Sequence, residues 1–272
     1  MQDWGRMSRA ARDAAYNNSL AVPGSPALNQ ARIEASAAFR ASVPGRLDLP
    51  YGPAPRQQWD LFPAAGPHAP CFAFIHGGYW QRNRREEFCC LGEGLRAHGW
   101  SVALPGYTLA PDATLTEIVA EMAAALDWLA AEGPAHGVAG PVLLSGWSAG
   151  GHLTAMALGH PLVAAGLAIS GIFELGPVRD TYLDAALRLT DAEVEALSPL
   201  RLPPVRKPMT LAYGTAELPP LVADSRDLNA MRAAAHAEGA LLPLAGADHF
   251  TIVEQLRDPA SPLVRAALGL MA

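Results

Sequence analysis

The sequence predicts an α/β fold in which helices cover both faces of a mostly parallel sheet. Short apolar runs such as Cys71–Ile75 are continuous rather than alternating, as expected of strands that are buried on both faces. Helical patterns separate these runs. The clearest is Thr114–Glu132, in which Ile118, Met122 and Leu126 repeat at intervals of four residues. Strands that alternate with helices in this way predict a parallel sheet.

The remaining elements are expected in a regular order along the chain. Residues 5–42 are rich in Ala, Arg and Gln and are predicted to be helical. Two short alternating stretches, 46–51 and 57–62, flank Gly52–Pro55 and predict a hairpin at an antiparallel edge of the sheet. Further strands are expected at 100–104, 141–144, 165–170, 209–213 and 240–244. Further helices are expected at about 84–98, 149–159 and 220–237, with helical stretches closing the chain.

Two segments stand outside the alternating pattern and define the expected domain organisation. Residues 1–45 are expected to form an N-terminal helical extension that packs on the main domain, which comprises residues 46–272. Within that domain, an insertion at about 172–207 holds two short helical candidates, Tyr182–Leu189 and Asp191–Leu197. An insertion of this length in a compact domain is usually a functional lid, so we expect a short helical cap.

Composition and charge exclude several classes of protein. Half of the residues are hydrophobic and 17% are charged, which is too apolar for a disordered chain. The net charge of −6 argues against nucleic-acid binding and against a polybasic membrane anchor. The three cysteines, Cys71, Cys89 and Cys90, do not form a disulfide framework. The first residues lack a signal-peptide pattern and the longest apolar run, 162–169, cannot span a bilayer, so we expect a cytoplasmic protein.

The strongest chemical motif lies at residues 146–150, which read G-x-S-x-G between a predicted strand and a predicted helix. This context is typical of a nucleophile elbow, in which the serine occupies a strained turn that lifts its hydroxyl clear of the sheet. Side chains at Gly146 and Gly150 would collide with adjacent strands or with the helix. The following helix directs its positive N-terminal end at the site where negative charge develops. We therefore predict Ser148 as the nucleophile.

A second motif, His76-Gly77-Gly78-Tyr79-Trp80, directly follows the strand at 71–75. Glycines in such a loop let backbone N–H groups approach a tetrahedral oxyanion closely. Gly77 and Gly78, together with the N–H of Ala149, are the predicted oxyanion hole. His76 precedes the nucleophile in sequence, whereas the expected order is serine, acid, histidine, so we interpret it as a brace for the loop.

The base and the acid are expected in loops that follow the last two strands. His249 is the histidine that follows the final predicted strand, whereas His152 lies on the helix of the elbow and should point away from Ser148. The acid should orient the imidazole and stabilise its charged form. Glu217 is the first carboxylate after the strand at 209–213, and Asp224 is the alternative.

These residues resemble the arylformamidase (kynurenine formamidase) family of α/β-hydrolases. The resemblance extends over roughly residues 46–258. It includes the H-G-G-x-W loop at 76–80, Ser148–Leu153, Leu187–Leu189 followed by Ser198–Leu200, and His249–Ile252. It implies an α/β-hydrolase fold, a triad of Ser148, Glu217 and His249, and hydrolysis of an aryl formamide such as N-formylkynurenine. Two residues depart from the family pattern: Trp147 stands where a histidine is frequent, and Glu217 replaces the more usual aspartate.

Three functions remain open at this stage. The first is cleavage of a small acyl group from an aryl amide or ester. The second is a carboxylesterase of broad, short-acyl scope, and the third is a catalytically silent α/β-hydrolase that serves as a binding module. The side chains expected to contact substrate are Tyr79, Trp80, Trp147, Phe173 and Tyr182. Arg82, Arg84 and Arg85 follow the loop, and one of them could receive a substrate carboxylate.

No cofactor and no metal are expected, because the chain lacks a dinucleotide-binding glycine motif and a cluster of metal ligands. The expected partner is a small acyl amide or ester substrate. The sequence does not determine the oligomeric state, and a homodimer stays open because two-fold dimers are the commonest oligomers.

Overall fold

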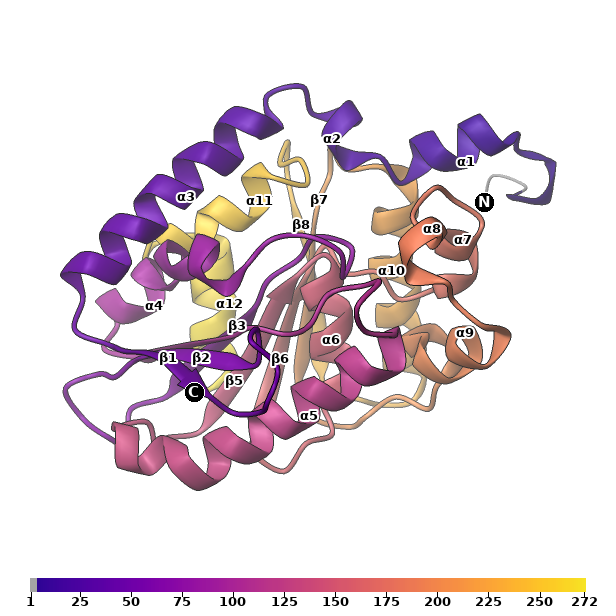
Figure 1. The fold of residues 1–272 in the computed structure, drawn as a ribbon. Helices are drawn as coiled ribbons and strands as arrows, with labels where there is room; N and C mark the ends of the chain where they lie inside the picture. Colours follow the sequence, from indigo (N-terminus) through magenta and orange to yellow (C-terminus); the bar gives the residue numbers. More distant parts are fainter. Residues whose placement is uncertain (1–3) are drawn as a thin grey trace.

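The computed structural model describes residues 4–272, so the first three residues of the N-terminal segment lie outside the described part. One eight-stranded sheet runs through the molecule in the order β1-β2-β4-β3-β5-β6-β7-β8 (Figure 1). β1 and β2 are antiparallel to each other, β2 is antiparallel to β4, and the remaining neighbours are parallel. The strands are β1 (Arg46–Pro50), β2 (Gln58–Phe62), β3 (Cys71–Ile75), β4 (Ser101–Pro105), β5 (Val142–Trp147), β6 (Val163–Ile169), β7 (Met209–Gly214) and β8 (Gly239–Leu244).

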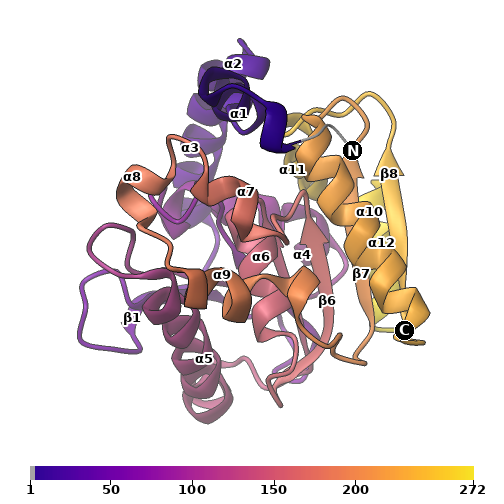
Figure 2. The same cartoon turned by 90° about the vertical axis from the view of Figure 1, so that its right-hand side faces the viewer.

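Helices cover both faces of the sheet and build a hydrophobic core on each (Figures 1 and 2). Strand β3 shows the principle: Cys71, Ala73 and Ile75 belong to one core, and Phe72 and Phe74 belong to the other. This division follows from the alternation of side chains along a strand. The α-helices of the main domain are α4 (Glu93–Ala97), α5 (Leu115–Glu132), α6 (Ala149–Ala157), α7 (Leu175–Arg179), α8 (Asp184–Leu187), α9 (Asp191–Leu197), α10 (Pro219–Ala234), α11 (Thr251–Glu254) and α12 (Pro262–Leu270).

The predicted fold class is confirmed, and the expected strands agree with the observed ones to within three residues at each end. The predicted helix at 84–98 is wrong in type. It consists of a 3₁₀ helix, η2 (Arg85–Gly92), followed by the short α4. Glycines lower helix propensity there, and the backbone packs closely on the sheet. A Cβ at Gly92 would lie 2.7 Å from Val102 Cγ1 of β4.

The insertion between β6 and β7 forms a cap of three short α-helices, α7, α8 and α9, and a 3₁₀ turn, η4 (Pro199–Arg201). The sequence predicted α9 and a helix that contains all of α8, but it missed α7. The predicted helix Tyr182–Leu189 is shorter than expected because Arg188 adopts a left-handed conformation (φ 52°), which ends α8. Asp224 of α10 attaches the start of the cap, since its carboxylate accepts hydrogen bonds from the backbone N–H groups of Phe173 (2.6 Å) and Glu174 (3.2 Å).

The N-terminal segment crosses the same end of the molecule as the cap (Figures 1 and 2). It contains a 3₁₀ turn, η1 (Trp4–Arg6), followed by α1 (Arg9–Ala15), α2 (Asn18–Ala21) and α3 (Ser25–Ser42). Trp4 Nε1 donates to Asp180 at 3.0 Å, and Asp13 accepts from the backbone N–H of Tyr182 at 2.7 Å. The segment and the cap are therefore joined directly.

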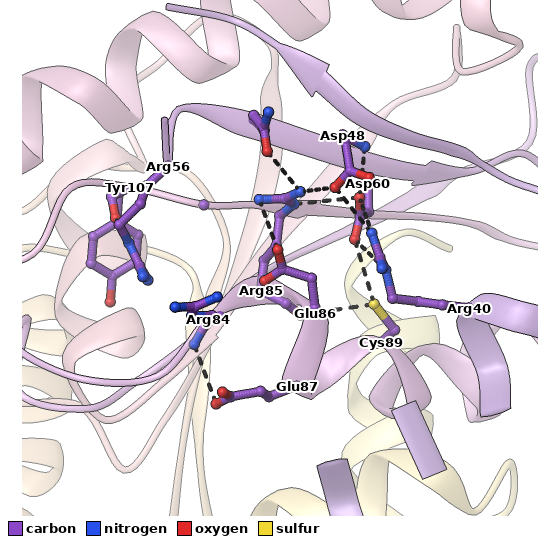
Figure 3. Close-up of polar contacts among 12 residues, drawn as sticks. Arg40, Asp48, Arg56, Asp60, Arg84, Arg85, Glu86, Glu87, Cys89 and Tyr107 are labelled. Carbon is purple, nitrogen blue, oxygen red and sulfur yellow. Dashed lines mark hydrogen bonds and ion pairs between the residues drawn. The ribbon is translucent and has the colours of Figure 1, made fainter. Parts of the chain in front are cut away.

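A buried ion cluster joins α3, the β1–β2 hairpin and η2 (Figure 3). The Asp60 side chain is fully buried. Its carboxylate pairs with Arg40 Nε at 2.9 Å and with Arg85 Nε at 3.3 Å. Arg85 is itself 4% exposed and also pairs with Asp48 and Glu86. The cluster fixes three segments that are distant in sequence.

The ion cluster predicts a large stability effect at Asp60. Asp60→Asn leaves the two guanidinium groups without their shared, fully buried counter-charge, and we expect it to lower the free energy of unfolding by about 3 kcal/mol. Asp127→Asn is the matched control: Asp127 is largely exposed and pairs with His160, so we expect a change below about 1 kcal/mol. Urea denaturation measures both, and equal effects would contradict this role of the cluster.

The cap attachment predicts a pH-dependent stability. Burial raises the pKa of Asp224 to about 7, while hydrogen bonds from Phe173 and Glu174 oppose this shift. Because the folded-state pKa is the higher one, the contribution of Asp224 to stability is fully present below about pH 4 and is lost as the pH rises to about 7, by at most about 4 kcal/mol. Asp224→Asn cannot ionise and should flatten this part of the curve. Urea denaturation between pH 4 and 8 measures it, and an unchanged slope would refute the assignment.

Candidate active site

The turn that carries Ser148 joins the end of β5 to the first residue of α6. Ser148 adopts φ 59° and ψ −120°, a strained conformation for a residue with a side chain. The flanking glycines are required by close contact: a Cβ at Gly146 would lie 2.2 Å from Gly150 O, and one at Gly150 would lie 2.0 Å from Ile75 O. The residues therefore form the strand–turn–helix geometry expected of a nucleophile elbow.

His249 and Glu217 meet in loops that follow β8 and β7. His249 Nδ1 lies 2.9 Å from Glu217 Oε2. The other carboxylate oxygen, Oε1, accepts hydrogen bonds from the Ser170 hydroxyl (2.5 Å) and the Gly214 N–H (2.7 Å). A carboxylate only accepts, so a neutral His249 carries its proton on Nδ1 and presents a basic Nε2. Trp147 Nε1 also donates to the His249 carbonyl at 2.8 Å and holds the loop.

The alternative acid lies elsewhere. Asp224 is engaged by the backbone of the cap. Asp248, the neighbour of His249, accepts from the N–H groups of Phe250 and Thr251 within its own loop. Among Glu217, Asp224 and Asp248, Glu217 is the carboxylate in contact with His249.

The loop after β3 lies directly against the elbow. A Cβ at Gly77 would lie 2.6 Å from Trp147 O and 2.9 Å from Ser148 Cβ. Gly78 has φ 118°, which favours glycine, and it borders the same cavity as Ser148. Asn83 Nδ2 donates to the Gly77 carbonyl at 3.1 Å and fixes the loop from the far side.

Two other histidines near the elbow are structural. His76 is buried, stacks on Tyr107 with ring centroids 4.4 Å apart, and places Nδ1 2.8 Å from Gly77 O. Burial lowers the pKa of His76 to about 3, so it stays neutral. His152 is buried with Nε2 2.7 Å from Leu197 O, and burial lowers its pKa to about 4.

Ser148 and His249 border one cavity of about 480 Å³, a volume that includes open solvent at its mouth. Residues from four parts of the chain line it: Asn18, Ser19 and Asn29 of the N-terminal segment; Gly78, Tyr79, Arg82 and Asn83 after β3; Trp147 and Phe250 beside the elbow; and Tyr182 of the cap. The walls combine aromatic rings with amide groups and one guanidinium.

Of the five residues expected to contact substrate, three border the cavity and two do not. Tyr79, Trp147 and Tyr182 border the cavity. Trp80 and Phe173 do not: both are fully buried in the core, and Trp80 packs edge-to-face on His152 at 5.0 Å. Tyr79 and Trp80 both have positive φ angles, of 53° and 57°, so the loop turns sharply after Gly77 and Gly78. Tertiary contacts separate the two rings: Trp80 packs on His152, whereas the Tyr79 hydroxyl donates to the Tyr16 carbonyl of the N-terminal segment.

The three arginines after the loop also have different environments. Arg82 borders the cavity and contacts Tyr182. Arg84 is the N-cap residue of η2, and Arg85 belongs to the buried ion cluster. Asn18, Asn29 and Asn83 were not predicted as site residues. A polar run such as Asn17–Ser19 is also a usual helix-cap pattern, and Asn17 does cap α2, so it gave no signal for a cavity.

Among residues 4–272, no group of three or more His, Cys, Asp or Glu side chains is placed to hold a metal ion. Within the same described range, no helix is both long and apolar enough to cross a membrane.

Comparison with known proteins agrees with this geometry. A family model described as BD-FAE, an α/β-hydrolase family, matches residues 61–160. The chain is 26% identical to kynurenine formamidase of Danio rerio over 100% of this chain and 99% of the relative. It is 26% identical to the Salmo salar kynurenine formamidase over 83% of this chain and 81% of the relative.

Solved structures show the same fold. A crystal structure from Silicibacter sp. TM1040, described provisionally as a thioesterase, has a TM-score of 0.84 and 28% identity, and the match covers 96% of this chain and 98% of that one. Esterase B of Lactobacillus rhamnosis has a TM-score of 0.71 at 21% identity over 96% of this chain and 94% of that one, a likeness of fold. The chain is therefore a hydrolase enzyme with the α/β-hydrolase fold, and it is similar to the kynurenine formamidases.

Proposed function

We propose that the protein cleaves a small acyl group from an aryl amide or ester through a triad of Ser148, His249 and Glu217. The observation that carries the proposal is the His249–Glu217 hydrogen bond of 2.9 Å, beside a cavity that also contains Ser148 in a strained turn. The curated relatives named kynurenine formamidase favour an aryl formamide as substrate.

The chemistry is a two-step acyl transfer. Ser148 Oγ attacks the substrate carbonyl while His249 Nε2 takes its proton. The negative charge on the tetrahedral oxygen is stabilised by backbone N–H groups of Gly77, Gly78 and Ala149. The intermediate collapses, and His249 returns the proton to the departing nitrogen or oxygen. Water then attacks the acyl-enzyme by the same route and releases the acid, while Glu217 holds the imidazole throughout.

The cavity favours a flat leaving group and a short acyl group. Tyr79, Trp147 and Tyr182 border it and offer aromatic faces. A long acyl chain needs a deep apolar tunnel, whereas the lining of this cavity combines aromatic rings with amide groups and one guanidinium. Arg82 is the residue placed to receive a carboxylate on the leaving group.

A carboxylesterase of broad, short-acyl scope is the second candidate, because several solved relatives of this fold are esterases. Comparing acetanilide with phenyl acetate on purified protein discriminates between the two. A catalytically silent binding module is the third candidate. It predicts that an organophosphonate leaves the chain unlabelled in intact mass spectrometry.

Substitution of Ser148 tests its proposed role as the nucleophile. Ser148→Ala should lower kcat by at least about 1,000-fold and abolish phosphonate labelling, because no other hydroxyl replaces the one on the strained turn. Ser19→Ala is the matched control. Ser19 borders the same cavity, and its loss should change kcat less than about threefold. Equal effects of the two substitutions would refute the assignment.

Substitution of Glu217 tests its proposed role as the acid of the triad. Glu217→Gln keeps the shape of the side chain but favours the wrong imidazole tautomer, and we expect kcat to fall by about 1,000- to 10,000-fold. Asp224→Asn should stay within about tenfold, since Asp224 contacts the cap backbone rather than His249. The reverse ranking in steady-state assays would transfer the role to Asp224.

Substitution of Arg82 tests its proposed role in binding a substrate carboxylate. Arg82→Leu should raise KM about tenfold for substrates whose leaving group carries a carboxylate and leave neutral analogues unchanged, because a charge-assisted hydrogen bond is lost. Arg84→Leu is the control, since the exposed Arg84 lies outside the cavity lining. A uniform rise in KM for charged and neutral substrates would show that Arg82 does not bind a carboxylate.

A further inference from the structure

Helix α2 of the N-terminal segment places one unusual polar side chain at the cavity. Asn18 borders the cavity together with Ser148 and His249, yet it is only 4% exposed. Its Oδ1 atom has no hydrogen-bond partner among residues 4–272. An unpaired buried amide oxygen is destabilising because it has lost its hydrogen bonds to water, and native proteins rarely keep one.

Tyr79 fixes which end of the Asn18 amide is free. The Tyr79 hydroxyl donates its single proton to the Tyr16 carbonyl at 2.6 Å. It can therefore only accept from Asn18, whose Nδ2 lies 2.9 Å away. The amide nitrogen must face Tyr79, and Oδ1 is left as the unpaired end of the side chain.

The other two amide side chains of the cavity each have one polar end engaged. Asn29 Oδ1 accepts from Arg32 Nη2 at 2.6 Å, and Asn83 Nδ2 donates to the Gly77 carbonyl at 3.1 Å. Asn18 thus offers a pre-oriented acceptor. Because an amide oxygen carries no proton, only an N–H or O–H donor can satisfy it.

We propose that Asn18 Oδ1 accepts a hydrogen bond from an N–H group of the substrate's leaving group and selects amine-bearing leaving groups over their oxygen or carbon counterparts. The inference rests on the proposed function, since it assigns a specificity residue to the same cavity. An amide nitrogen keeps its N–H from substrate to released amine, whereas an ester oxygen carries no hydrogen in the substrate. A leaving group without the donor would leave Oδ1 unpaired, which is how buried polar groups discriminate between ligands.

Matched substrate pairs test the proposal. Acetanilide carries an N–H at the scissile bond, where phenyl acetate has an ester oxygen. 3-Aminophenyl acetate carries an amino group on the ring, where 3-methylphenyl acetate has a methyl group. For each pair, the ratio of kcat/KM for the donor-bearing member to that for its partner is compared between wild type and Asn18→Leu. This comparison cancels the intrinsic reactivity of the esters and amides. We expect the ratio to fall about tenfold for at least one pair.

A neighbouring substitution controls for damage to the helix. Asn17→Leu removes the side chain that caps α2, whose Oδ1 accepts from the Leu20 N–H at 3.0 Å, and leaves Asn18 in place. The ratios should stay within twofold of wild type. Two outcomes would overturn the proposal: ratios that do not change in Asn18→Leu, or ratios that fall equally in Asn17→Leu. Either result would assign Asn18 a structural role or a bound water only.

A binding measurement keeps the test independent of turnover. NMR titration of the wild type and of Asn18→Leu with aniline, the amine product of acetanilide, and with toluene compares a donor-bearing ligand with an isostere that has no N–H or O–H. The wild type should bind the amine more tightly, and Asn18→Leu should bind both equally. Failure of the proposed function would appear as absent hydrolysis of every substrate with the binding difference intact. Failure of the present inference would appear as no binding difference in the wild type.

Discussion

Close packing of the loop after β3 against the turn after β5 is the constraint on which the site depends. The two backbones meet with no room for a side chain at Gly77 or Gly150. Only this contact brings the N–H groups of one loop next to the serine of the other. It is possible because β3 and β5 are parallel neighbours, so their carboxyl ends lie at the same edge of the sheet.

The contact is held by a shell of polar and aromatic groups. Asn83 binds the Gly77 carbonyl, and Arg56 in turn donates to the carbonyls of Asn83 (2.5 Å) and Tyr107 (2.8 Å). Tyr107 stacks on His76 and donates to its carbonyl at 2.9 Å. The hairpin that carries Arg56 is itself tied to α3 and η2 by the Asp60 cluster (Figure 3). Rigid support of this kind is what a preorganised oxyanion site requires.

The N-terminal segment completes the cavity rather than merely covering the domain. Asn18 and Asn29 form part of its wall, and Tyr79 binds the segment through Tyr16. The same segment contacts the cap through Trp4 and Asp13. The size of the cavity therefore depends on two segments that are far apart in sequence, the N-terminal extension and the cap.

The sequence by itself determined the α/β fold, the strand positions and the residues of the elbow, because these follow from local periodicity and from glycines that a tight turn requires. It also placed Glu217 and His249 in loops at one edge of the sheet, where the structure brings them into contact. Tertiary structure alone decided which aromatic rings reach the cavity. Trp80 and Tyr79 are adjacent and both have positive φ angles, so backbone conformation does not separate them. Trp80 packs against His152 in the core, whereas Tyr79 borders the cavity. Tertiary structure also decided that Arg85 is buried in the ion cluster, whereas Arg82 borders the cavity. It likewise brought Asn18 to the cavity. The sequence could not predict these placements, because long-range packing leaves no trace in the local residue pattern.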